Sequence, residues 1–247
     1  MTTKEFRARK LRACGSLVLI DSDKGGQGKS IQARALTYQL SSRGVPLALF
    51  DGDERNAHLQ RFCGQQLVTT RFDARSEAGW TELFNGLDQL EPNQVALVDL
   101  CAGAGAHLHN EAARLLANQE FGMPLIHVWM ADASEDSVRL FRDLLPIAPA
   151  KQTVFVMNMK DDASLDRFGI WMNSHTRAQF IADGGTEITL PRLNLRVHDK
   201  IAAERLPFPT ERPVNWARGD WFTFLSFKAA LEKEQAPLIK LIEEMSS

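Results

Sequence analysis

The stretch Asp23–Ser30, with the sequence Asp-Lys-Gly-Gly-Gln-Gly-Lys-Ser, decides the fold of this chain. It comes just after the apolar run Leu17–Ile20 and just before a segment whose apolar residues have helical spacing. Glycines here let the backbone turn so that successive N–H groups point inward at anionic oxygens. In such a loop Lys29 reaches the outer phosphates of a nucleotide, and the Ser30 hydroxyl holds Mg²⁺. The stretch therefore predicts a phosphate-binding loop between a strand and a helix.

Apolar runs alternate with helix-length segments after this loop. The runs are apolar throughout, which is typical of strands that are covered on both faces. We expect strands at Leu17–Ile20, Pro46–Phe50, Val95–Leu100, Leu125–Met130 and Thr153–Met157, and helices at Ser30–Arg43, Glu77–Leu90, His107–Asn118 and Ser134–Leu145. This order predicts an α/β fold with a single doubly wound, mostly parallel sheet flanked by helices. Ligands bind such a sheet at the carboxyl ends of its strands.

The C-terminal third offers weaker signals. The spacing predicts a helix around Ala163–Ser174, a strand at Thr186–Leu190, a helix near Val197–Arg205 and a C-terminal helix over 221–247 that is broken or kinked at Pro237. Three prolines place 206–213 in a loop. The chain contains no internal repeat and no low-complexity tract, so we expect a single domain over 1–247 that begins with a basic segment at 1–14.

Composition excludes several classes of protein. The 247 residues are 44% apolar and 24% charged, and the net charge of −2 gives no overall attraction to nucleic acid or acidic membranes. Cys14, Cys63 and Cys101 are widely spaced, which argues against a disulfide framework or paired zinc ligands and fits a reducing compartment. No apolar run approaches the length of a membrane span. We therefore expect a cytoplasmic protein.

Acidic side chains follow two further strands. Asp51 and Asp53 lie at the mouth of the second expected strand, and Asp99 lies at the end of the third. An aspartate after an apolar strand can hold a water on Mg²⁺, and a second carboxylate can orient an attacking water. The alternative is a turn-forming or helix-capping acid. The spacing from the glycine loop favours the catalytic interpretation for Asp53 and Asp99, whereas the two interpretations balance for Asp51.

These motifs together resemble the ParA/MinD family, the SIMIBI-class P-loop ATPases with a deviant Walker A loop. The family pattern K-G-G-x-x-K-[ST] is matched from Lys24 to Ser30. Asp51-Gly-Asp53 matches the family's D-x-D, and the stretch Asp99–Gly103 resembles its D-x-x-A-G motif. Asn158 and Pro191 fall where members of the family commonly contact adenine, although either residue could simply end a strand.

The resemblance implies a role for each matched residue. Lys24, Lys29 and Asp53 form the implied catalytic set, in which Lys24 reaches the phosphates of a second subunit and Asp53 positions the attacking water. Ser30 is the implied direct Mg²⁺ ligand, with Asp51 and Asp99 in the outer shell. The implied ATP contacts are Lys24, Gly25, Gly26, Gln27, Gly28, Lys29, Ser30, Ile31, Asn158, Pro191 and Arg192. ATP and Mg²⁺ are therefore the expected cofactors.

The chain departs from the family pattern in two places. Glu54-Arg55 replaces the Pro-Gln of the segregation ATPases, and Cys101 stands where proline is common. Cys101 also matches a switch cysteine of the iron–sulfur reductase relative, but without a second suitable cysteine we expect it to be a packing residue. A pair of neighbouring histidines is by itself seldom a metal site, so we do not expect His107 and His109 to bind a metal. The amino-acid sequence around the loop most resembles that of plasmid-encoded family members that accompany conjugative-transfer or plasmid-stability genes.

The implied function is a Mg²⁺-dependent ATPase that forms an ATP-bridged homodimer, is slow without a partner and acts in plasmid DNA positioning, partition or conjugative transfer. A nucleotide-dependent protein-binding module with little turnover is the alternative. A small-substrate kinase or ligase is disfavoured, because Lys24 has a task only in a dimer. Non-specific DNA is a candidate partner through the basic bias of 192–218, and a protein partner is also expected. Residues 228–247 are not a basic amphipathic helix, so membrane attachment is disfavoured.

Overall fold

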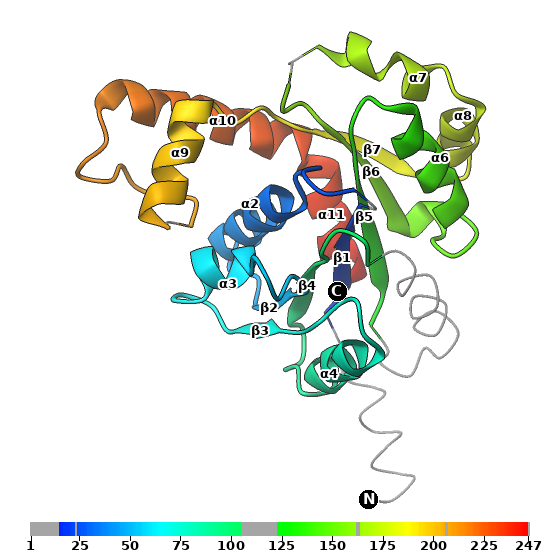
Figure 1. Ribbon diagram of the computed structural model, residues 1–247, viewed down its shortest axis with the longest axis horizontal. Coiled ribbons are helices and arrows are strands. Elements are labelled where there is room, and N and C mark those ends of the chain that lie inside the picture. The colour runs from blue at the N-terminus through cyan, green and yellow to red at the C-terminus, as the bar shows by residue number, and fades with distance from the viewer. Residues whose placement is uncertain (1–14, 23, 105–122, 162–163, 206, 247) are drawn as a thin grey trace, which may run out of the picture.

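One parallel sheet organises the chain, as the sequence predicts (Figure 1). The computed structural model describes residues 15–22, 24–104, 123–161, 164–205 and 207–246. Seven strands lie in the order β3-β2-β4-β1-β5-β6-β7, and every neighbouring pair is parallel. They are β1 (Leu17–Asp21), β2 (Leu47–Asp51), β3 (Thr69–Arg71), β4 (Val95–Asp99), β5 (Leu125–Ala131), β6 (Thr153–Asn158) and β7 (Thr186–Leu190).

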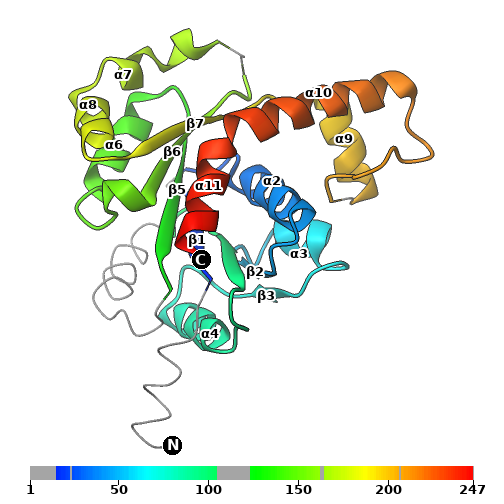
Figure 2. The same ribbon diagram turned by 180° about the vertical axis from the view of Figure 1, so that it is seen from behind.

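Helices cover both faces of the sheet, as Figures 1 and 2 show from opposite sides. One face carries α2 (Lys29–Ser42), α3 (His58–Cys63), α9 (Leu195–Glu204), α10 (Arg218–Glu234) and α11 (Ala236–Met245). The other carries α4 (Glu77–Asp88), α6 (Glu135–Leu144), α7 (Gly169–Met172) and α8 (His175–Ala182). Two short 3₁₀ helices, η1 (Ala150–Gln152) and η2 (Leu165–Phe168), complete the described elements.

The two-sided burial explains why the strands are apolar throughout. Successive side chains of a strand point to opposite faces of the sheet. In β1, Val18 and Ile20 join the apolar cluster under α2 and α11, whereas Leu17 and Leu19 join the cluster under α4. A polar residue at any of these positions would be buried on one face or the other. The sequence pattern and the doubly wound architecture are therefore two expressions of one constraint.

Most expected elements lie where the sequence predicts them. The five long strands match to within one residue at each end, and β7 matches at both ends. The sequence interpretation missed α3 and β3, because β3 is only three residues long and its last two residues are exposed. The helix expected at 107–118 and the basic segment at 1–14 lie outside the described residues.

One C-terminal prediction is wrong, and a second is confirmed with different bounds. The single helix expected over Ala163–Ser174 is replaced by η2 and α7, and Ser174 instead caps a further helix, α8, by accepting a hydrogen bond from Arg177 N at 3.0 Å. The last helix also begins earlier than expected and is divided in two at Gln235. The helix is therefore broken close to Pro237, as one of the two expected alternatives has it, and is not kinked. Pro237 lies in the first turn of α11, where its missing N–H leaves no intrahelical bond unmade.

A buried amide fixes the C-terminal helices onto the helix that follows the glycine loop. The Gln235 Nε2 donates to Gln32 Oε1 at 2.6 Å, and the Gln235 Oε1 accepts from Gln39 Nε2 at 2.9 Å. Both partners lie on α2, and all three side chains are buried. The hydroxyls of Ser246 and Ser16 are 2.8 Å apart, so the end of the described chain also meets the start of β1.

An aromatic cluster supports the α6 side of the sheet and yields a stability prediction. Phe141 is fully buried, with its ring centroid 4.8 Å from Phe155, 5.0 Å from Phe180 and 5.5 Å from Trp171. We expect Phe141→Ala to lower the free energy of unfolding by about 3–5 kcal/mol, because it leaves a cavity among these rings. Urea denaturation followed by tryptophan fluorescence measures the loss. The matched control is Phe222→Ala, at a side chain 64% exposed, for which a loss as large as that of Phe141→Ala would contradict the argument.

Candidate functional site

The glycine loop connects the carboxyl end of β1 to α2 in a form that favours glycine at two positions. Gly26 and Gly28 have φ angles of 74° and 89°, in the left-handed region. A Cβ at Gly28 would lie 2.5 Å from the Asn158 Nδ2, so a side chain there is also excluded by contact. Gly28 caps α2 without a side-chain hydrogen bond, and the first turn of the helix contains no acid. The positive end of α2 is thus left available to an anion.

The Lys29 side chain is folded into this loop. Its Nζ donates to the carbonyl oxygens of Ser22 at 3.1 Å and Lys24 at 3.0 Å. Burial lowers the pKa of Lys29, and the nearby carboxylates of Asp21 and Asp99 act in the opposite direction. A buried ammonium group held by main-chain carbonyls can exchange those contacts for phosphate oxygens with little movement of the loop. This is the geometry expected of a phosphate-binding lysine.

Asp99 is the buried acid of the site. Burial raises the pKa of its carboxyl group to about 7, against a hydrogen bond from the Ser30 side chain. Its Oδ1 is buried and has no hydrogen-bond partner among the described residues. A water bound to Mg²⁺ would supply the missing donor and the positive charge, so the residues present fit this ion. In the described part of the chain no three His, Cys, Asp or Glu side chains are grouped to bind a metal directly, so the ion would depend on Ser30, phosphate oxygens and water.

Asp51 and Asp53 organise the loop that follows β2. The two carboxylate oxygens of Asp51 accept hydrogen bonds from the backbone of Asp53 at 3.2 Å and of Gln60 at 3.1 Å. Burial raises the pKa of Asp51, although these hydrogen bonds act against it. Both Asp51 oxygens are therefore engaged, which matches the turn-forming alternative, and the metal role of Asp51 stays a prediction.

Asp53 is held in the charged form. Its Oδ1 accepts from the backbone N–H groups of Arg55 and Asn56, each at 3.1 Å, and its Oδ2 accepts from Asn56 Nδ2 at 3.3 Å. Partial burial acts to raise the pKa of Asp53, but the hydrogen bonds outweigh it and the pKa is lowered. An ionised, oriented carboxylate of this kind can align a water molecule.

The Lys24 side chain contacts an acidic residue of the same chain in this structure. Its Nζ lies 2.7 Å from the Asp136 Oδ2, at the start of α6. The hydrogen bond from Lys24 is the main cause of the lowered pKa of Asp136. Both side chains are exposed, so this ion pair stabilises the fold little. The expected reach of Lys24 across a dimer interface stays a prediction, and it requires this contact to break.

Two residues that the sequence interpretation did not name support the loop. Asp132 follows β5, and its Oδ2 accepts from Gln27 Nε2 at 2.8 Å. Although burial acts to raise it, the pKa of Asp132 is held well below its usual range by hydrogen bonds from Ser134, Ser137 and Gln27. Lys160 donates from Nζ to the Gly26 carbonyl at 2.8 Å. The signal for Asp132 was an acid directly after an apolar run, the same signal that identified Asp99.

The remaining candidate residues lie around the same loop. Asn158 ends β6, and its Nδ2 donates to the Gln27 carbonyl at 2.7 Å, so in this structure it holds the loop. Pro191 and Arg192 directly follow β7, with Pro191 half-buried and Arg192 exposed. Ile31 is half-buried in the first turn of α2, and Gly25 is exposed. The adenine and ATP contacts of these residues stay predictions.

Three further features bear on the expectations. Cys101 is buried in the apolar cluster under α4, as expected of a packing residue, whereas His107 and His109 lie outside the described residues. In the basic region 192–218, Arg196 and Lys200 pair with Asp220 at 2.6 and 3.3 Å. This pairing neutralises part of the positive charge that the sequence places there.

Comparisons with known proteins find similarity along most of the chain. No protein-family profile matches. Protein MobD of Acidithiobacillus ferrooxidans is 25% identical over 193 residues, which cover 77% of this chain and 84% of MobD. A nucleotide-binding protein from Archaeoglobus fulgidus, solved in complex with ADP, is 16% identical with a TM-score of 0.52 and coverage of 90% of this chain and 96% of that one. A variant of Cyanothece McdA in complex with ATP is 12% identical with a TM-score of 0.51 and coverage of 92% and 97%.

The fold is that of the P-loop NTPases. The resemblance to the ParA/MinD group is confirmed at the level of the fold, since these structures cover nearly the whole of the chain. Among the described residues no helix is long and apolar enough to cross a membrane.

The raised pKa of Asp99 predicts a pH dependence of stability. Between the ordinary pKa of 3.8 and the folded value of about 7, the folded chain holds a proton that the unfolded chain has lost. Stability therefore falls as pH rises through this window. We expect Asp99→Asn, which cannot ionise, to raise the free energy of unfolding at pH 8 by on the order of 3 kcal/mol relative to the native chain and to have little effect at pH 4. Urea denaturation of the nucleotide-free protein at both pH values measures this, and equal effects at both would contradict a buried, raised Asp99.

Proposed function

We propose that this chain is a Mg²⁺-dependent ATPase that forms an ATP-bridged homodimer and is released from it by hydrolysis. The observation that carries the proposal is the pairing, at one glycine loop, of a buried Lys29 ammonium with a buried Asp99 whose Oδ1 lacks a partner. The first has the geometry for phosphate oxygens, and the second for the hydration shell of a cation. ADP and ATP in the two structural neighbours support a nucleotide at this loop.

In the proposed reaction the chain's own residues bind the phosphates, orient the attacking water and neutralise the developing charge. The loop N–H groups and the amino end of α2 hold the phosphates, and Lys29 neutralises the charge that develops on them. Ser30 and Asp99 would hold Mg²⁺, which when bound polarises the outer phosphates. Asp53, fixed by Arg55 and Asn56 backbone N–H groups, aligns the attacking water.

Lys24 gives the proposal its dimeric form. In a single subunit its ammonium group is 2.7 Å from Asp136, so it contributes nothing to its own phosphate site. A second subunit bound through ATP would offer Lys24 the phosphate charge in exchange for an exposed and weak ion pair. An isolated subunit therefore hydrolyses ATP slowly, and turnover depends on formation of the homodimer.

The biological setting proposed is plasmid DNA positioning, partition or conjugative transfer in the cytoplasm. The amino-acid sequence of the loop and the similarity of the chain to MobD support this setting. A protein partner and non-specific DNA are the proposed effectors of turnover. The second candidate function, a nucleotide-dependent binding module with little turnover, is favoured by the engagement of both Asp51 oxygens in backbone contacts.

Size-exclusion chromatography with light scattering tests the dimer directly. We expect Asp53→Ala to accumulate as an ATP-bound dimer, because ATP still bridges the subunits but the water is no longer aligned. Its ATP turnover should fall by about 10²- to 10⁴-fold. Lys24→Ala should remain monomeric with ATP. If the native chain and Asp53→Ala both stay monomeric with ATP and Mg²⁺, the proposed ATP-dependent dimerisation is excluded. If that monomer still hydrolyses ATP, the chain is an ATPase that works without dimerisation.

A substitution in the loop tests nucleotide binding separately from turnover. Gly28→Ala should weaken binding of a fluorescent ATP analogue by at least about 100-fold, because the added Cβ meets Asn158 at a backbone φ of 89°. The control is Gly169→Ala, whose Cβ would have no neighbour within 4 Å. Circular dichroism verifies that both variants fold. An analogue that binds Gly28→Ala as tightly as the control would place the nucleotide elsewhere.

A further inference from the structure

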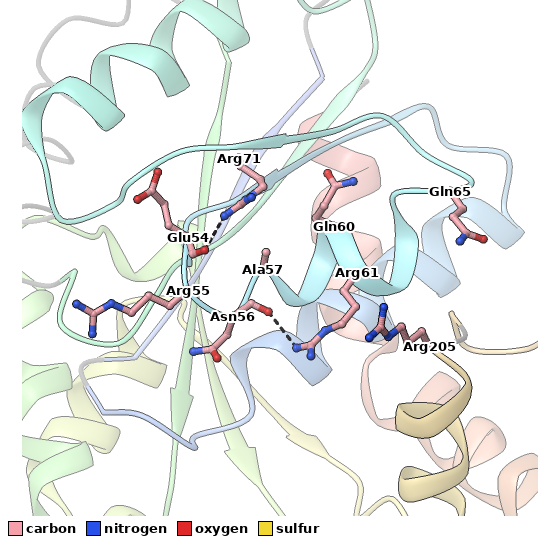
Figure 3. A pocket seen from close by; sticks show the side chains of 9 residues that line it. All are labelled: Glu54, Arg55, Asn56, Ala57, Gln60, Arg61, Gln65, Arg71 and Arg205. Carbon is pink, nitrogen blue, oxygen red and sulfur yellow. Dashed lines mark hydrogen bonds between the residues drawn. The ribbon is translucent and has the colours of Figure 1, made fainter.

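A second polar site lies beside the Asp53 loop, separate from the glycine loop (Figure 3). It is a hollow of about 520 Å³ between the turn after β2, helix α3, the end of β3 and the end of α9. Four arginines line it: Arg55, Arg61, Arg71 and Arg205. Glu54 is the one acidic residue in the lining. We call this hollow the arginine pocket.

The positive charge of the arginine pocket is not neutralised within the described chain. There, none of its four guanidinium groups forms an ion pair with a carboxylate. Arg71 donates to the main-chain carbonyl of Glu54, and Arg61 donates to the carbonyl of Asn56 at 3.0 Å, as the dashed lines in Figure 3 show. These contacts orient two of the four guanidinium groups, those of Arg61 and Arg71, without cancelling their charge. An exposed arginine cluster that the chain holds in part, and does not pair with carboxylates, is suited to an external anion.

Residues distant in sequence are brought together to build this site. Arg205 comes from the end of α9, whereas the other three arginines lie between residues 55 and 71. Arg205 and Ala57, both in the lining, are two of the three non-glycine residues in the described chain with positive φ, at 51° and 24°. A left-handed arginine costs about 1 kcal/mol, so it is an uncommon choice where glycine would serve as the helix cap.

We propose that the arginine pocket binds an acidic segment of a protein partner. Guanidinium groups bind carboxylates in a bidentate manner, and the carboxamides of Asn56, Gln60 and Gln65 in the same lining can pair with the peptide groups of an extended segment. Nucleic acid fits less well. The lining contains no aromatic ring on which a base could stack, and Ala57 is its only apolar side chain. A small nucleotide would fit poorly for the same reason, since the lining offers its base no aromatic ring to stack on.

Occupancy of the pocket would act on hydrolysis, and this step rests on the proposed function. The backbone N–H groups of Arg55 and Asn56 that hold the Asp53 carboxylate belong to residues that line the pocket. Gln60, also in the lining, donates its backbone N–H to Asp51 at 3.1 Å. A segment that engages these residues would therefore shift or fix the turn that sets the position of Asp53. The partner would control turnover without entering the nucleotide site.

The binding test uses the full chain and a fluorescein-labelled polyglutamate peptide, followed by fluorescence anisotropy at low salt. We expect Arg61→Gln and Arg205→Asn each to weaken binding about tenfold, since each removes one charge-assisted contact. Asparagine at 205 tolerates the left-handed backbone, so α9 keeps its cap. The control is Arg142→Gln on α6, an exposed arginine outside the pocket, which should bind as the native chain does. Equal affinities for all four proteins would overturn the proposal.

A competition arm separates the two kinds of macromolecule. Unlabelled polyglutamate should displace the labelled peptide at lower concentration than a DNA duplex or single strand of equal charge. If DNA binds more tightly and its binding is what Arg61→Gln and Arg205→Asn weaken, the pocket is a nucleic-acid site and the proposal is wrong.

ATP turnover measured with and without the peptide tests the coupling. We expect saturating peptide to change turnover of the native chain at least about threefold and to leave that of the Arg61→Gln, Arg205→Asn double variant unchanged. Peptide binding that depends on the pocket but leaves native turnover unchanged would overturn the coupling alone. A chain that binds the peptide through the pocket but neither binds nor hydrolyses ATP would refute the proposed function and leave the pocket standing.

Discussion

The burial of the Lys29 ammonium group, which main-chain carbonyls hold beside two acidic side chains, is the constraint on which this structure depends. Lys29 is placed by α2 beneath a loop whose carbonyls it binds, and the carboxylates of Asp21 and Asp99 end the two neighbouring central strands β1 and β4. Such a group is tolerated inside a protein only where partners surround it. The parallel sheet supplies those partners, because it brings the carboxyl ends of its strands to one edge.

The same constraint explains which parts of the fold are visible in the sequence. Strands covered on both faces must be apolar throughout, so the long strands were predicted to within one residue. Helix α3 and strand β3 carry no comparable signal, since they owe their place to the sheet edge and to the turn after β2. The capping serine that begins α8, Ser174, was a local signal that the expectation of one long helix overrode.

The site divides along a similar line. Loop residues such as Gly28, Lys29 and Ser30 were predicted from their spacing, because phosphate binding would require them to be consecutive, and their nucleotide contacts stay a prediction. Residues that act through space were not predicted: Lys160 meets the Gly26 carbonyl, and Asp136 meets Lys24, only after the sheet is assembled. The arginine pocket is the extreme case, since Arg205 joins it from a helix far along the chain. A basic residue in a sequence gives no indication of which other charges it will join.

The contact between Gln235 and α2 has a consequence for the order in which the molecule is made. Directly after Gln235, helix α11 packs against α2, the helix that follows the glycine loop, as Figure 2 shows. The residues of α11 are synthesised after α2 and after every strand of the sheet, so a nascent chain carries the whole glycine loop well before the helix behind it is enclosed. The apolar side chains of α2 that α11 covers then remain open to water or to chaperones until α11 has emerged. Enclosure of the helix behind the glycine loop is thereby tied to the emergence of α11.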